Sequence, residues 1–370
     1  MHLARLQRLR AALARAGFDC VAAIAGPNLF YLTGLSFHLS ERPTVGFFPA
    51  QGDPVLVAGN LEESKIVNGA PYPVRAFYYT DAGGPVTAFR EAAQALRLSK
   101  PRMGVEAVRM RVMELRLIEA AFLNPRVDSA EGIFAGLRMT KDALELSLMR
   151  RAVQIAEQAL LATLPTIRIG QTERQIASEL VVQALRAGSD AELPFAPIVA
   201  SGPNSALPHA TVTDRALQAG DLLTLDWGAA HNGYMADLTR TYAIGEIAPE
   251  LKTIYDLVLR ANAAGRAASR PGAMAAEVDA AARQVITDGG YGPYFVHRLG
   301  HGLGLEGHED PSMHGRNETV LEPGLTFTVE PGIYVPGLGG VRIEDDVVVT
   351  ENGCESLSTL PRELTVIGNG

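Results

Sequence analysis

The stretch Leu222–Ala243 constrains this chain more than any other, because it predicts one long β-hairpin with a fixed register. Two runs of mostly apolar and β-branched residues flank Asn232-Gly233, the dipeptide typical of a two-residue type I′ turn. With that turn, Asp226 and Asp237 share one face as diagonal neighbours, about 7–8 Å apart at Cα. Two carboxylates on a buried face repel each other unless a cation lies between them. The hairpin therefore favours metal ligands over two solvated aspartates.

The length of the chain predicts two domains, because 370 residues exceed one typical hydrophobic core. Helix and strand patterns alternate in the first part, which indicates an α/β domain. The polar, Pro- and Gly-containing stretch NPRVDSAEG predicts a break. We therefore expect an N-terminal α/β domain over residues 1–130 and a second, α+β domain over residues 131–370. Residues 1–16 are Arg-rich and acid-free, and we interpret them as a surface helix rather than a transit peptide.

The second domain is expected to combine long helices with short strands. Apolar residues recur there at helical spacing, and Thr172 with Gln175 forms a capping box at the start of the second helix. The C-terminal part returns to short strands and glycine-rich turns. The long helices are predicted at residues 141–165, 172–187, 250–269 and 274–289.

Composition excludes several classes of partner. The net charge of −8 and the pI near 5.6 argue against nucleic acid or an anionic membrane surface. No apolar run approaches the roughly 20 residues that a membrane span needs. Cys20 and Cys354 are the only cysteines, so there is no disulfide framework, and we expect a reducing, cytoplasmic location.

Candidate functional residues gather in the second domain, where six of the eight histidines lie between His209 and His314. A strand that carries Thr326 and Thr328 on one face is expected to end at Glu330, and Arg342 and Glu344 are expected to share another face. Three histidines lie in the Gly-rich segment FVHRLGHGLGLEGHEDP: His297, His301 and His308.

Two familiar motifs do not apply here. Residues 302–307 match G-x-G-x-x-G, but HEDP follows at once instead of a helix, and its carboxylates would repel a pyrophosphate. His297 and His301 are four residues apart, but Arg298 stands where the helical zinc motif needs a glutamate. We reject both interpretations.

The remaining donors form an oxygen-rich set: Asp226, Asp237, Glu330, Glu344 and one imidazole. Such a set cannot assemble without divalent cations, and its chemistry suits two ions such as Mn²⁺, Co²⁺ or Zn²⁺. Two such ions can activate a water molecule and stabilise a developing oxyanion.

The order of these residues resembles that of the pita-bread metallopeptidases, and most closely that of their prolidase and aminopeptidase P branch. The resemblance rests on Asp226 and Asp237, on a histidine in GHG and on glutamates in TVEPG and RIEDD. It covers the second domain, and the N-terminal α/β domain has the size that this branch carries. It implies a pita-bread catalytic domain over residues 131–370.

The resemblance also assigns roles to the metal ligands. It implies that Asp226 holds one of two metal ions, while Asp237 and Glu344 bridge both. It implies that His301 and Glu330 hold the second ion. Glu330 would also carry a proton from the attacking water to the leaving amine.

Further residues match substrate contacts of the family. His209 and His308 match histidines that steady the scissile carbonyl and the tetrahedral intermediate. His297 matches a substrate-side histidine, and Arg342 matches an arginine on the rim of the site. In the N-terminal domain, His38 and Arg42 could close over the end of the substrate that Arg342 contacts.

The activity that the resemblance implies is hydrolysis of Xaa-Pro bonds in small peptides, by a homodimer. We expect a proline dipeptidase, with Arg342 binding the free carboxylate of the substrate. The alternative is an aminopeptidase P that acts on longer Xaa-Pro peptides. A methionine aminopeptidase, a metal-free creatinase-like hydrolase and a non-catalytic module fit less well. The family's methionine aminopeptidases usually lack such an N-terminal domain, and the other two classes lose the metal ligands.

Overall fold

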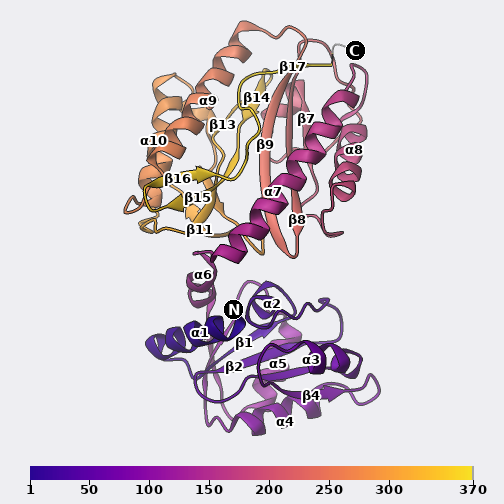
Figure 1. The fold of residues 1–370 in the computed structure, drawn as a ribbon, viewed down its shortest axis with the longest axis vertical. Helices are drawn as coiled ribbons and strands as arrows, with labels where there is room; N and C mark the ends of the chain where they lie inside the picture. Colours follow the sequence, from indigo (N-terminus) through magenta and orange to yellow (C-terminus); the bar gives the residue numbers. More distant parts are fainter. Residues whose placement is uncertain (369–370) are drawn as a thin grey trace. The chain divides into compact units, whose positions relative to one another are not determined.

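The computed structural model describes residues 1–368 and divides the chain into two compact units, Met1–Arg138 and Met139–Gly370 (Figure 1). The break predicted at residues 124–132 contains strand β6 (Arg126–Ser129) and the start of helix α6 (Glu131–Arg138), both in the first unit. Strand β6 lies at the edge of a sheet with its side chains half-buried or exposed. An edge strand needs no apolar run, which explains why its sequence resembles a loop.

The first unit is built on a six-stranded mixed sheet in the order β4-β3-β2-β1-β5-β6. Strand β2 is antiparallel to both of its neighbours, and the remaining pairs are parallel. The expected α/β character is confirmed. The other strands are β1 (Cys20–Ile24), β2 (Val45–Pro49), β3 (Val55–Gly59), β4 (Arg75–Tyr79) and β5 (Arg102–Val105).

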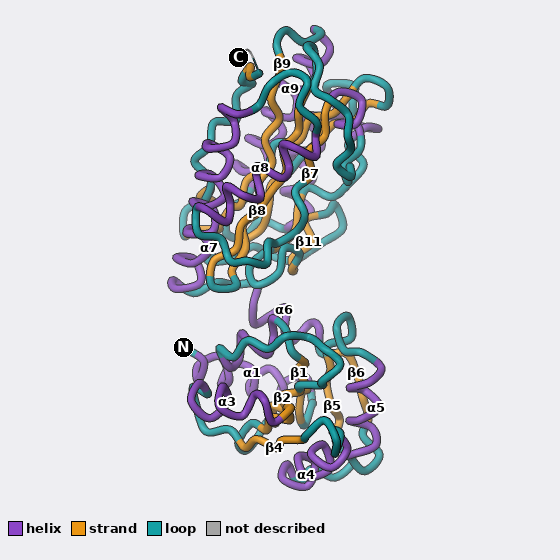
Figure 2. Tube along the Cα trace, turned by 90° about the vertical axis from the view of Figure 1, so that its right-hand side faces the viewer, coloured by secondary structure: helices purple, strands orange, loops and turns teal. Residues whose placement is uncertain are grey.

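Helices cover the sheet of the first unit (Figure 2). The predicted N-terminal surface helix is confirmed as α1 (His2–Ala16), which buries Leu6, Leu9 and Leu13 but leaves Leu3 exposed. The other helices are α2 (Pro27–Thr33), the 3₁₀ turn η1 (Asn60–Glu62), α3 (Glu63–Gly69), α4 (Val86–Leu96) and α5 (Val112–Ala121).

The predicted hairpin forms the centre of the second unit and is confirmed residue by residue. Strands β8 (Leu222–His231) and β9 (Tyr234–Ile244) are antiparallel and join at Asn232 and Gly233. Both turn residues have positive φ, 51° and 80°, as a type I′ turn requires.

The second unit contains three sheets within residues 139–368. The hairpin belongs to a four-stranded sheet in the order β17-β9-β8-β7, beside a five-stranded sheet in the order β11-β10-β12-β15-β16 and the pair β13-β14. Beyond the hairpin, the strands are β7 (Ile198–Ser201), β10 (Gly300–Gly302), β11 (Glu309–Met313), β12 (Thr326–Val329), β13 (Gly332–Val335), β14 (Gly339–Arg342), β15 (Asp345–Thr350), β16 (Gly353–Ser356) and β17 (Val366–Ile367).

Two helix pairs lie on opposite sides of these strands (Figure 1). All four predicted long helices are confirmed, including the Thr172–Gln175 capping box of α8. Helix α7 packs on the hairpin, where the Nε1–H of Trp227 donates to the Ala156 carbonyl at 2.9 Å. The helices are α7 (Ala143–Thr163), α8 (Glu173–Arg186), α9 (Pro249–Ala268) and α10 (Ala275–Asp288), with 3₁₀ turns η2 (Leu164–Thr166), η3 (Gly202–Ala206) and η4 (Gly292–Tyr294).

Over residues 1–368, no helix is both long enough and apolar enough to cross a bilayer.

Candidate metal centre

The hairpin presents two buried carboxylates side by side. Asp226 comes from β8 and Asp237 from β9, and Thr239, which shares their face, lies directly opposite Asp226. The backbone N–H of Asp237 donates to Oδ2 of Asp346 at 3.1 Å, so the second sheet fixes the position of this aspartate.

Glu344 reaches the hairpin from the segment between β14 and β15. Its backbone N–H donates to the Thr239 carbonyl at 3.1 Å, and the Thr239 hydroxyl donates to Glu344 Oε2 at 2.5 Å. These two bonds place the Glu344 carboxylate on the same side as Asp226 and Asp237.

The GHG segment supplies the imidazole. Strand β10 runs between β11 and β12 so closely that a Cβ at Gly300 or Gly302 would collide with backbone of these neighbours. The Nδ1 of His301 lies 3.0 Å from the Gly302 carbonyl, which requires the proton on Nδ1. The Nε2 lone pair of His301 is therefore free for a cation.

The predicted ligands converge in space. Ligand atoms of Asp237, His301 and Glu344 all lie within 4.8 Å of one another, and all three residues are buried. The Nε2 of His301 is 3.3 Å from Glu330 Oε1 and 3.7 Å from Asp237 Oδ2. Oxygen and imidazole donors at these separations can surround small divalent cations.

The electrostatics of this cluster favour bound cations. Burial and the neighbouring carboxylates raise the pKa of Asp237 and of Glu344 well above the ordinary range. Burial also raises the pKa of Glu330 to about 7 and lowers the pKa of His301 to about 3. With Asp226 and the single guanidinium of Arg342, the ionised cluster carries three more negative than positive charges. Divalent ions would offset this excess.

One carboxylate oxygen gives a direct test of whether a metal fits. Oδ2 of Asp226 accepts a hydrogen bond from Arg342 Nη2 at 2.5 Å, whereas Oδ1 is buried and has no hydrogen-bond partner among residues 1–368. A buried carboxylate oxygen is costly without a partner. A divalent cation next to Asp237 would satisfy it, so the donor set fits the metals that the sequence predicts.

Arg342 lies inside the site rather than on its rim. The side chain is 5% exposed, and its guanidinium donates to Asp226, to the Tyr334 hydroxyl at 2.8 Å and to the Thr239 hydroxyl at 3.1 Å. It also donates to the Pro208 carbonyl at 3.3 Å. The rim position was expected from the family resemblance alone, and strand alternation could not correct it, because alternation predicts the face of a residue but not its depth.

Tyr334 was missed by the sequence reasoning. Its hydroxyl accepts from Arg342 and lies 3.0 Å from Nε2 of His297, whose Nδ1 faces the Arg298 carbonyl at 2.7 Å. Burial lowers the pKa of His297 to about 4, so the neutral ring accepts the tyrosine proton. Its only sequence signal was its place four residues after Glu330, and that signal was weak, because β12 ends at Val329 and Tyr334 lies on β13 of another sheet.

The other two predicted histidines flank the ligands. The His308 ring meets the His301 ring edge to face, with centroids 4.1 Å apart. Burial raises the pKa of Asp226, and the charges of Arg342, His209 and His308 act against that shift. Arg342, which pairs with Asp226, also donates to the carbonyl of Pro208, the residue before His209. Both histidine side chains are exposed, which leaves them accessible to a substrate.

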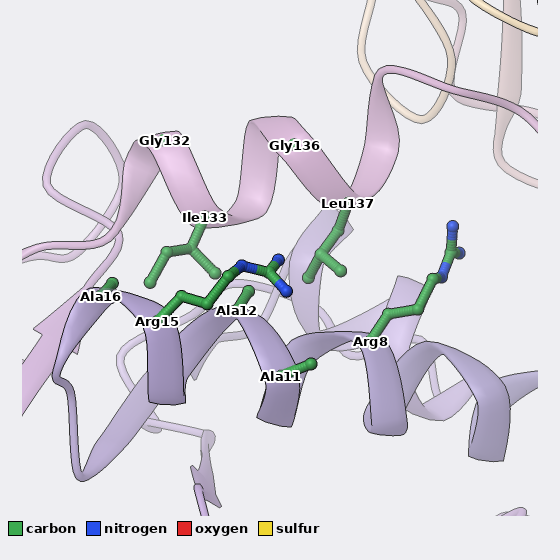
Figure 3. Close-up of a pocket in the computed structure, with 9 residues that line it drawn as sticks. All are labelled: Arg8, Ala11, Ala12, Arg15, Ala16, Gly132, Ile133, Gly136 and Leu137. Atoms are coloured by element: carbon green, nitrogen blue, oxygen red, sulfur yellow. The ribbon is translucent and has the colours of Figure 1, made fainter.

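His38 and Arg42 belong to the first unit. His38 is exposed, and Arg42 is held by Asp81 through two hydrogen bonds of 2.8 and 2.9 Å. The first unit also contains a cavity of about 460 Å³ between α1 and α6, lined by Arg8, Arg15 and small or aliphatic residues (Figure 3). This cavity has no carboxylate or imidazole in its lining and offers no cation site.

Comparison with known proteins gives consistent matches. Residues 147–351 match Metallopeptidase family M24, and residues 5–140 match the Creatinase/Prolidase N-terminal domain. An Xaa-Pro dipeptidase of Pyrococcus horikoshii is 34% identical over 355 residues, which cover 94% of each chain.

Solved structures align over almost the whole chain. A dipeptidase from Pyrococcus horikoshii OT3 has a TM-score of 0.93 at 40% identity, covering 98% of this chain and 100% of its own. An X-Pro aminopeptidase from Thermotoga maritima MSB8 has a TM-score of 0.85 at 32% identity, covering 98% and 99%.

Proposed function

This chain belongs to metallopeptidase family M24, and from that premise we propose that it is a dipeptidase that hydrolyses the Xaa-Pro bond. The expected fold, an N-terminal α/β domain followed by a pita-bread catalytic domain, is confirmed. The observation that carries the proposal is the buried cluster of Asp237, His301 and Glu344, with Glu330 3.3 Å from His301. An Xaa-Pro aminopeptidase is the alternative, since an enzyme of that name shares the fold.

The family implies divalent metal ions, and we propose two ions, of Mn²⁺, Co²⁺ or Zn²⁺. Asp226 would bind one ion through its unpaired oxygen, Asp237 and Glu344 would bridge, and His301 and Glu330 would bind the second. A set of four carboxylates and one imidazole suits these ions better than a soft-ligand metal.

The residues around the ions would transfer the proton and stabilise the oxyanion. Divalent ions held here supply Lewis-acid activation of water and of the scissile carbonyl. Glu330, directly after β12, would accept a proton and pass it to the leaving proline nitrogen. His209 and His308 would donate hydrogen bonds to the developing oxyanion, because both are accessible beside Asp226.

The contacts of Arg342 make it a less suitable partner for the substrate carboxylate than the sequence predicted. A dipeptide presents a free carboxylate next to its proline, and a fixed cation would bind it. Arg342 would have to share its guanidinium between that carboxylate and its four protein acceptors, so we propose that it acts mainly by orienting Asp226. His297, His38 and Arg42 stay proposals for substrate contact, and the homodimer stays a prediction.

The test compares Ala-Pro with Ala-Pro-Ala on one preparation loaded with Mn²⁺. We expect a higher kcat/KM for the dipeptide, measured as release of the N-terminal alanine. The Asp237→Asn variant is the control for contaminating peptidases and should release none. If the metal-loaded protein leaves both peptides intact, the proposal is wrong. A clear preference for the tripeptide would assign the aminopeptidase activity instead.

A further inference from the structure

One buried carboxylate outside the metal centre holds both ends of the loop that carries His209. This loop, residues 202–212, follows β7 and precedes the segment that leads into β8. The carboxylate belongs to Glu173, the first residue of α8, whose side chain is completely buried.

Oε1 of Glu173 accepts hydrogen bonds from residues at the start of the loop. The backbone N–H and the hydroxyl of Ser201 both donate to it at 2.8 Å, and Nδ2 of Asn204 donates at 3.0 Å. Oε2 accepts hydrogen bonds from Thr213 at the end of the loop. The backbone N–H of Thr213 donates to it at 3.0 Å and the Thr213 hydroxyl at 2.6 Å.

These donors keep the carboxylate ionised despite its burial. Burial by itself raises the pKa of Glu173, but the hydrogen bonds from Thr213, Ser201 and Asn204 outweigh it, and the pKa is lowered. The N-terminus of α8 adds a positive partial charge beside the same group. Glu173 is therefore an acceptor only, with both oxygens engaged by donors.

The middle of the loop is attached to the metal centre. The backbone N–H of Gly340 on β14 donates to the Ser205 hydroxyl at 2.8 Å, and Arg342 donates to the Pro208 carbonyl. His209 follows directly. The loop is thus held at its two ends by Glu173 and at its centre by the strand that ends at Arg342.

We propose that Glu173 is a positioning residue for hydrolysis, because its carboxylate closes the base of the loop and so fixes His209 beside Asp226. This inference rests on the proposed function, in which His209 acts on the substrate.

Glutamine at this position gives a sharp test because no orientation of its amide replaces the carboxylate. An NH₂ group at the Oε1 site would face the N–H of Ser201, and at the Oε2 site it would face the N–H of Thr213. Either way one backbone N–H, the buried one of Ser201 or the part-buried one of Thr213, loses its acceptor. We therefore expect Glu173→Gln to lower kcat for Ala-Pro by about 10- to 100-fold, the effect that one such group can have.

A double-mutant cycle separates positioning from general damage. In a His209→Ala background, Glu173→Gln should change kcat by less than about twofold, because the residue it positions is already gone. Metal content and KM should stay at the values of the parent in both backgrounds. Glu179→Gln is the matched control, since Glu179 lies on the same helix but contacts Gln183 rather than the loop.

Hydrogen exchange gives a readout that does not depend on activity. In Glu173→Gln, the amides of residues 201–213 should exchange faster while those of β8 and β9 keep their protection. Equal losses in both backgrounds, or unchanged kcat and exchange, would overturn the proposal. If Glu173→Gln does not fold, Thr213→Val is the second variant. It removes the hydroxyl that donates to Glu173 and that accepts from Asn204 and from the Arg215 N–H, but it keeps the carboxylate and the Thr213 N–H, so it should give the same pattern, more weakly. A wild-type protein that is inactive on Ala-Pro would refute the proposed function. The exchange experiment would still test whether Glu173 holds the two ends of the loop.

Discussion

Replacing Arg342 by alanine tests whether its guanidinium belongs to the buried centre or serves only as a substrate contact. The group donates to Asp226, Tyr334, Thr239 and the Pro208 carbonyl, and its side chain is 5% exposed. Removing one partner of a buried ion pair costs about 3–5 kcal/mol, whereas an exposed pair contributes about 0–1 kcal/mol. Because Arg342 is buried, we expect its removal to cost about 3–5 kcal/mol of folding free energy.

That cost converts into a large shift in thermal stability. For a unit of this size, 1 kcal/mol lowers the melting temperature by about 2–4 °C, so Arg342→Ala should lower it by roughly 6–20 °C. Arg342→Lys keeps a positive charge but cannot reach four acceptors with one ammonium group, so its melting temperature should fall between those of alanine and wild type.

The assay is thermal unfolding of Mn²⁺-loaded protein followed by circular dichroism, with kinetics on Ala-Pro measured in parallel. The structure predicts that kcat falls along with stability, because Asp226 loses its orientation. If Arg342→Ala melted within about 2 °C of wild type and changed only KM, the contribution would be that of an exposed group. Burial would then not determine how much this guanidinium contributes to stability.

Three further outcomes are expected. Removal of the metal by chelation should abolish hydrolysis and lower the melting temperature, and Mn²⁺, Co²⁺ or Zn²⁺ should restore both; full turnover in verified metal-free protein would contradict this. Glu330→Gln should retain metal but lose at least about 10²-fold in kcat, since an amide cannot accept the proton; wild-type turnover would assign the proton to another group. Burial raises the pKa of Glu106 to about 7, so the native state binds the extra proton and stability should fall as pH rises from about 5 to 8, by at most about 3 kcal/mol in urea unfolding. Glu106→Gln should flatten this dependence, and an unchanged slope would exclude Glu106 as its source.

Local chemistry explains why some of the fold could be predicted from the sequence. The Asn232-Gly233 turn determines the register of β8 and β9 within a few residues, and the Thr172 capping box marks where α8 begins. Both signals act over short stretches of chain, so neither needs the tertiary structure. The shared face of Asp226 and Asp237 follows from that register alone.

Contacts between distant segments could not be predicted in the same way. Arg342 meets Asp226 across 116 positions of sequence, and alternation along a strand does not tell whether its face points to solvent or into a core. Glu173 lies between the two residues of the Thr172–Gln175 capping box and was not predicted to have a role, although its carboxylate binds residues 28 to 40 positions away. Strand β6 was not predicted from the sequence, because this edge strand carries polar side chains instead of an apolar run.

The packing of Trp227 against α7 gives the protein a built-in optical reporter. It is the only tryptophan of the chain, it is fully buried, and it lies next to Asp226 on β8. Selective excitation of the indole therefore follows the second unit alone, whereas tyrosines are present in both units. When the hairpin separates from α7, the indole loses its bond to the Ala156 carbonyl and meets water, so its emission moves to longer wavelength. Fluorescence and circular dichroism recorded on one sample can thus resolve whether the two units unfold together or in sequence.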